Sequence, residues 1–81
     1  MKINFKKQYE LFNKAEGLLE KGKTNEIMNI FKNIFGNDTN YIHAVILTES
    51  NPEYSLYSKN LNNLLYKYYI ETLTTNIFGK I

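Results

Sequence analysis

Side chains that commonly carry catalysis or bind metals are few in this sequence. His43 is the single histidine and cysteine is absent, so a nucleophilic triad and a zinc site both lack their parts. A lone histidine within an apolar run is more often a packed or surface residue than a catalyst. We therefore expect no catalytic residue, no metal and no cofactor, and hence a protein that is not an enzyme.

The eight acidic residues and four glycines form no recognisable site either. The acids include neither a Glu-x-x-His pair nor an aspartate-rich calcium loop. The glycines are too scattered for a loop that cradles phosphate. We expect the acids to lie on solvated helix faces.

The basic residues argue against specific nucleic-acid binding. All ten are lysine, and arginine is the residue that grips phosphate or guanine at two points. Residues 24–47 suggest a helix-turn-helix, but its second helix would present Asn40, Tyr41, His43 and Thr48 without a lysine. A net charge of +2 adds little affinity through counterion release. An ordinary helical hairpin is favoured, and a small DNA-associated regulator that uses 24–47 stays as an alternative.

The composition indicates an AT-rich gene. Asparagine (12), lysine (10), isoleucine (9) and tyrosine (7) make up nearly half of the 81 residues, and all four have A/T-rich codons. A chain of this length forms one helical domain, 1–81. Without cysteine, and without an apolar run near the roughly 18 residues of a membrane span, we expect a cytoplasmic protein that does not contact the membrane.

Apolar residues recur with helical spacing in the first 36 positions. A first helix is bounded by Asn4, a capping residue, and by Gly22, which suits a left-handed helix end. Thr24 is the expected N-cap of a second helix, which stops at Gly36.

Residues 41–49 have the composition of a strand but also fit a helix. Asp38 or Thr39 could cap a helix whose Ile42, Val45 and Ile46 line up on one side. A strand would pair only with a short segment at 54–58, and an isolated hairpin is marginal. We therefore predict an all-α fold, a small antiparallel bundle of three to four helices. The alternative is an α+β fold with a short hairpin at 41–58.

The C-terminal part predicts one long helix. Asn51, Pro52 and Glu53 form a helix-start signal, and nothing breaks the pattern before Phe78. Alternatively, Ser55 or Ser58 caps the helix, which then begins directly after that residue.

This helix has two apolar faces, each within a sector about 100° wide. The first face contains Tyr54, Tyr57, Leu61, Leu64, Leu65, Tyr68 and Thr72. The second face contains Tyr66, Tyr69, Ile70, Leu73 and Ile77. A narrow polar strip is made of Asn60, Asn63, Lys67, Glu71 and Thr74.

The second apolar face has two interpretations. Either the helix is central and packed on both sides by the others, or the second face binds another molecule. Three short helices supply few large side chains to cover both faces, and tyrosine tolerates water on its hydroxyl. We therefore predict that Tyr66, Tyr69, Ile70, Leu73 and Ile77 bind a protein partner, a toxin or an enzyme, or mediate self-association through the C-terminal helix.

In size, genome type and lack of catalytic parts, the chain resembles immunity proteins, antitoxins and phage-encoded inhibitors. The resemblance implies a protein-binding module that occludes a toxin or a host enzyme. A structural homodimer without a further target is the remaining alternative.

Overall fold

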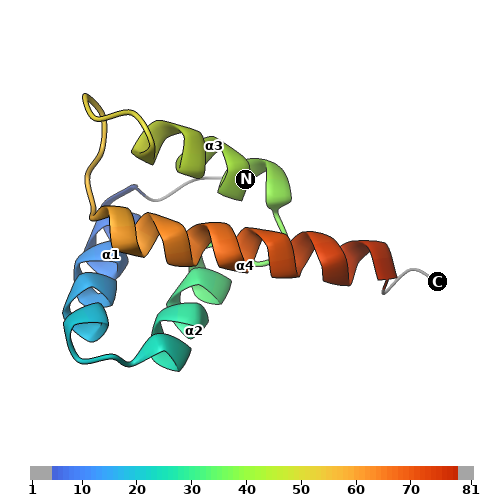
Figure 1. The fold of residues 1–81 in the computed structure, drawn as a ribbon, viewed down its shortest axis with the longest axis horizontal. Helices are drawn as coiled ribbons and strands as arrows, with labels where there is room; N and C mark the ends of the chain where they lie inside the picture. The colour runs from blue at the N-terminus through green and yellow to red at the C-terminus, as the bar shows by residue number, and fades with distance from the viewer. Residues whose placement is uncertain (1–4, 79–81) are drawn as a thin grey trace.

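Residues 5–78 are described by a computed structural model and contain four α-helices and no strand (Figure 1). They are α1 (Phe5–Glu20), α2 (Thr24–Phe35), α3 (Thr39–Glu49) and α4 (Lys59–Phe78). The predicted all-α fold is therefore confirmed. The alternative hairpin at 41–58 is wrong, because 39–49 is helical and 50–58 forms turns.

The end of α1 explains how the chain turns into α2. Gly22 has a φ of 72°, in the left-handed region that glycine adopts without strain. Its N–H donates to the carbonyl of Leu19 and the N–H of Lys23 donates to the carbonyl of Leu18, which is a Schellman motif. The predicted cap at Asn4 lies outside the described residues.

The starts of α2 and α3 differ in how they are capped. Thr24 is the first residue of α2 and not its cap, because the helix begins directly after the Schellman turn. Lys23 takes the cap position without a side-chain hydrogen bond. At α3, by contrast, the carboxylate of Asp38 accepts a hydrogen bond of 3.1 Å from the N–H of Tyr41. The predicted helix over 41–49 is thus capped as expected.

The predicted start of α4 at Asn51 is wrong, and the helix begins eight residues later at Lys59. The side-chain oxygen of Asn51 accepts from the N–H of Glu53, and its carbonyl accepts from the N–H of Tyr54. These bonds close a single turn that does not continue. The alternative cap, Ser58, starts the helix, and its hydroxyl accepts from the N–H of Leu61.

The helices form two antiparallel pairs, α1 with α2 and α3 with α4, and the pairs meet at α4 (Figure 1). In Figure 1, α1 and α2 run across one side of α4, and α3 runs along the other side. The C-terminal end of α4 extends beyond the other three helices in that view. Within the described residues, no helix combines the length and the apolar character that a membrane crossing requires.

The core lies where α4 meets the α1–α2 pair and α3. Its buried apolar residues are Phe12, Ala15, Ile27, Ile30, Phe31, Phe35, Ile42, Ile46, Tyr57, Leu61 and Leu65. The first apolar face of α4 faces this core, and the buried Thr72 extends it. Tyr54 does not join it, because it lies in the turn before the helix and is exposed.

Candidate functional site

The second apolar face of α4 is not buried at any of its five residues. Tyr66, Ile70 and Ile77 are 54%, 42% and 63% exposed. Tyr69 and Leu73 are half-buried. The interpretation of α4 as a central helix packed on both sides therefore fails for this face. Its role in binding stays a prediction.

Helix α3 covers one edge of this face. The ring of His43 stacks on the ring of Tyr69, with centroids 5.6 Å apart and an interplanar angle of 11°. Tyr69 in turn lies 6.3 Å from Tyr66, centroid to centroid. His43 is exposed and its position is that of a surface aromatic packed on a tyrosine.

Two contacts across the α3–α4 interface show how the two helices are aligned. One is the stacking of His43 on Tyr69. The other is a hydrogen bond of 3.2 Å from the side-chain amide of Asn62 to the hydroxyl of Ser50. The two contacts are seven residues apart on both helices, and the helices run in opposite directions. This fixes a single antiparallel alignment.

That alignment brings a further apolar residue to the face, which the sequence analysis did not assign to it. Leu47 lies one turn after His43 on the same side of α3, where the alignment places it level with residue 65, and it is 59% exposed. The sequence shows only that His43 and Leu47 are four residues apart and so lie on the same side of a helix. The α3–α4 alignment is needed to show that this side borders the second apolar face of α4. The α3–α4 face, as used below, consists of His43, Leu47, Tyr66, Tyr69, Ile70, Leu73 and Ile77.

Charge is sparse on and around this face. The described part of α4 carries only Lys59, Lys67 and Glu71 as charged residues, and all three are exposed. Lys67 and Glu71 lie in the polar strip that borders the face. A surface of this kind binds through apolar contact and tyrosine hydroxyls and not through many ion pairs.

Both tyrosines with raised pKa values lie on the packed side of the molecule. Burial raises the pKa of Tyr57, and the carboxylates of Glu49 and Glu16 raise it further. Burial, followed by the charge of Asp38, raises the pKa of Tyr41. In each case the raised pKa keeps the phenol neutral near neutral pH.

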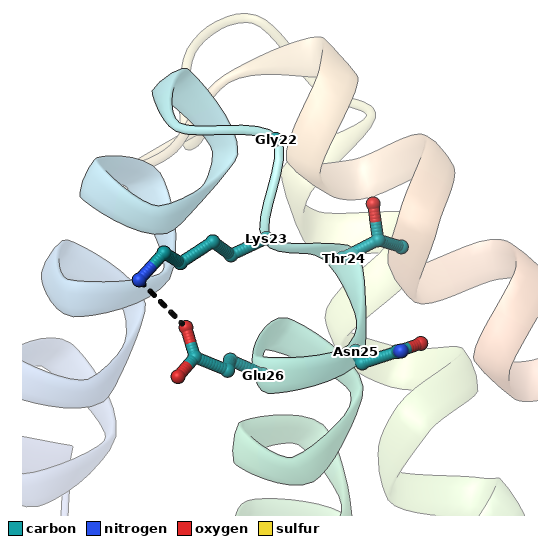
Figure 2. Close-up of a pocket in the computed structure, with 5 residues that line it drawn as sticks. All are labelled: Gly22, Lys23, Thr24, Asn25 and Glu26. Atoms are coloured by element: carbon teal, nitrogen blue, oxygen red, sulfur yellow. Dashed lines mark ion pairs between the residues drawn. The ribbon is translucent and has the colours of Figure 1, made fainter.

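The hollow shown in Figure 2 lies at the α1–α2 turn, has a volume of about 350 Å³ and is lined by residues 22–26. Lys23 and Glu26 point toward each other across it, with a nitrogen–oxygen distance of 3.9 Å. More than half of each side chain is exposed, so the pair contributes little. In the part of the chain that the structure describes, no three His, Cys, Asp or Glu side chains gather where a metal could bind.

The outer side of α3, the helix that a DNA reader would use, is neutral. Its exposed residues are Asn40, His43, Ala44, Leu47 and Thr48. A leucine 59% exposed to water fits contact with an apolar surface better than contact with phosphates.

Comparison of the chain with protein-family models, with curated proteins and with solved structures gives no match.

Proposed function

We propose that this chain is a non-enzymatic protein-binding module and that its partner docks on the α3–α4 face. The class of protein is that of immunity proteins, antitoxins and inhibitors, which act by occluding a toxin or an enzyme. The mechanism is steric, and it requires no group on this chain to react.

The observation that carries the proposal is the exposure of large side chains on one side of the molecule. Tyr66, Ile70 and Ile77 of α4 are each more than 40% exposed, and so is Leu47 of α3, one turn after His43. Single exposed apolar residues are ordinary on a protein surface, whereas a contiguous group of them marks an interaction site.

The arrangement of the face also suits an interface. Tyr69 is braced by the stacked ring of His43, so it loses little conformational freedom when a partner binds. Tyr66 projects beside it and can bury its ring while its hydroxyl makes a hydrogen bond. Aromatic residues of this kind carry a large share of the binding energy in interfaces that have been dissected by mutation.

A site-specific cross-linking experiment tests the proposal. A photoreactive amino acid replaces Tyr66, and the matched control carries it at Lys14, an exposed position on α1. After irradiation in extracts of the source cells, proteins joined only through position 66 are identified, purified and titrated against the unmodified chain. We expect Tyr66→Ala to weaken binding at least roughly tenfold and Lys14→Ala to leave it unchanged.

The same titration defines the result that would overturn the proposal. Equal cross-linking from positions 66 and 14 would mean that the face has no preferred partner. An affinity that is unchanged by both Tyr66→Ala and Ile70→Ser would place the interface elsewhere.

A further inference from the structure

The α3–α4 face contains one residue of a type that changes charge near neutral pH. Histidine is the only side chain that ordinarily gains a proton between pH 5 and 8, and His43 is the single histidine of the chain. It is exposed, so water can deliver a proton to it while no partner is bound. A change of charge on this face near neutral pH is therefore a change at His43.

His43 lies within the face and not at its end. Its ring stacks on that of Tyr69, with centroids 5.6 Å apart. Leu47 follows His43 by one turn on α3, and Ile77 follows Tyr69 by two turns on α4. Because the two helices are antiparallel, Leu47 and Ile77 lie on opposite sides of the stacked pair. A partner that contacts both of these exposed side chains has to cover His43 as well.

The stack keeps the imidazole on the face whether or not it carries a proton. The two rings are nearly parallel, with an interplanar angle of 11°. A cation within about 6 Å of the centroid of an aromatic ring is attracted to the face of that ring. Protonation therefore does not drive His43 away from Tyr69, and its charge stays where a partner docks.

On α4, the helix that His43 faces, the charged residues are turned away from it. The titratable residues beside His43 on this helix are Tyr66 and Tyr69. Lys67 and Glu71 are each two positions from Tyr69, so they lie about 160° around the helix from it. Neither of them can pair with His43 from that side.

The acids on α3 and α2 do not pair with His43 either. Asp38 and Glu49 lie at the two ends of α3, where each carboxylate accepts hydrogen bonds from backbone N–H groups. On α2, the other helix that contacts α3, the charged residues are Glu26 and Lys32, and both are exposed. Within residues 5–78, none of these carboxylates forms an ion pair with His43. A proton on His43 therefore adds a positive charge to the face without a counter-ion there.

We propose that protonation of His43 releases the partner from the α3–α4 face, so that binding is tight at neutral or higher pH and weakens as the pH falls. This inference rests on the proposed function. Binding removes the imidazole from water, and burying a charge that lacks a counter-ion is costly. A neutral imidazole can be covered as readily as the tyrosines beside it. Since the surrounding face is apolar, a partner surface that fits it is also apolar and brings no carboxylate to His43.

Titration of the purified cross-linking partner between about pH 8 and about pH 5.5 tests the inference. We expect the Kd of the wild type to rise at least roughly fivefold over this range, and by no more than about tenfold per pH unit, because one proton is linked to binding. In His43→Gln, the Kd should be level over the same range, whatever its absolute value. His43→Lys, which is positively charged throughout, should bind weakly at both ends of the range.

The comparison with His43→Gln is also the control for the partner. Groups of the partner that titrate appear equally in the wild type and in His43→Gln, so the difference between the two profiles belongs to His43. Circular dichroism at each pH verifies that every variant remains helical.

The possible failures can be told apart. Parallel pH profiles for the wild type and His43→Gln would overturn the inference and leave the proposed function intact. Binding that tightens in acid in the wild type alone would also overturn it, because the partner would then provide a carboxylate for His43. Absence of a partner that depends on Tyr66 would overturn the proposed function, and the pH effect with it.

Discussion

Tyr57 is the residue where the loop before α4 is joined to the core. Its ring packs against that of Phe12, with centroids 4.7 Å apart, and its hydroxyl donates to the side-chain oxygen of Asn62 at 3.3 Å. Burial and the nearby carboxylates of Glu49 and Glu16 raise the pKa of its phenol. In the unfolded chain the same phenol has a pKa of about 10. The folded state therefore holds this proton more tightly than the unfolded state does.

This difference predicts a loss of stability at alkaline pH. The contribution of Tyr57 is complete below about pH 10 and falls as the pH rises above that value, because the unfolded chain then releases the proton first. Tyr57→Phe should change the free energy of unfolding at pH 7 by no more than about 1 kcal/mol and should make its decline above pH 10 less steep. Urea unfolding at several pH values measures this. The control is Tyr54→Phe, whose ring is exposed, and an identical decline in Tyr57→Phe and wild type would contradict the prediction.

Neighbouring residues of α4 allow a second test at the scale of single side chains. Leu65 is fully buried, whereas Tyr66 is 54% exposed. Leu65→Ala should lower the free energy of unfolding by about 2–5 kcal/mol, because it leaves a cavity in the core. Tyr66→Ala should lower it by less than about 1 kcal/mol, since more than half of the Tyr66 side chain is already exposed to water. Chemical denaturation of both variants measures these two free energies of unfolding. Equal decreases in the two variants would mean that Tyr66 stabilises the fold as much as Leu65 does.

Among the elements, the segment 50–58 is held by carboxylates on the helices around it. The carboxylate of Glu49 accepts hydrogen bonds from the N–H groups of Leu56 and Tyr57, at 2.6 and 3.3 Å. The carboxylate of Glu16, on α1, accepts from the N–H of Ser58 at 2.6 Å. These bonds use backbone donors that a helix beginning at residue 51 would require for itself.

The start of α4 therefore depends on a contact that local sequence does not reveal. Asp38 and Gly22 could be assigned from the sequence because a cap and a left-handed turn are made by residues close by. Asn51 carries an equally good local signal, yet Glu16, 42 positions away from Ser58, decides the outcome. Likewise, helical periodicity located the second face of α4, but only the packing of α3 decided that Tyr69 would be half-covered and that Leu47 would join the face.

The contribution of the Glu16–Ser58 hydrogen bond to stability can be measured. Glu16→Ala should lower the free energy of unfolding by about 1–3 kcal/mol, because the N–H of Ser58 loses its acceptor. Glu16→Gln keeps an oxygen at this position and should lose less. Denaturation gives the energies, and amide hydrogen exchange at Ser58 should accelerate in Glu16→Ala. Glu20→Ala is the control, as Glu20 is exposed at the end of α1. Slow exchange at Ser58 in Glu16→Ala would show that another group holds the segment.

At the scale of the whole molecule, the low net charge of +2 limits interaction with nucleic acid. No lysine lies on α3, and the exposed side of that helix includes Leu47. We expect any DNA affinity to be non-specific, with a Kd of roughly 10⁻⁴ M or weaker at physiological salt. Fluorescence anisotropy with unrelated duplexes measures it. A nanomolar, sequence-dependent Kd would support the DNA-associated regulator instead.

The same shortage of charge governs the expected complex with a protein partner. Contacts made by the α3–α4 face are mainly apolar, so screening by salt should weaken them little. We expect Kd to change less than about tenfold between roughly 50 and 500 mM NaCl, whereas charge-driven complexes are strongly salt-dependent. Titrations at several salt concentrations with the cross-linked partner provide the test. A hundredfold weakening would mean that the lysines dominate the contact.

The pairing of helices that are neighbours in the sequence also bears on how the chain folds. The α1–α2 and α3–α4 pairs are closed by the connections 21–23 and 50–58, and most contacts join residues that are close along the chain. Such topologies fold in microseconds to milliseconds.

Fewer contacts join the two pairs to each other than join the helices within each pair. Each pair can therefore open as a separate cooperative unit, and hydrogen exchange should divide the described residues into two groups with different protection. The bond between Glu16 and Ser58 crosses that division, and it couples the opening of one unit to the other.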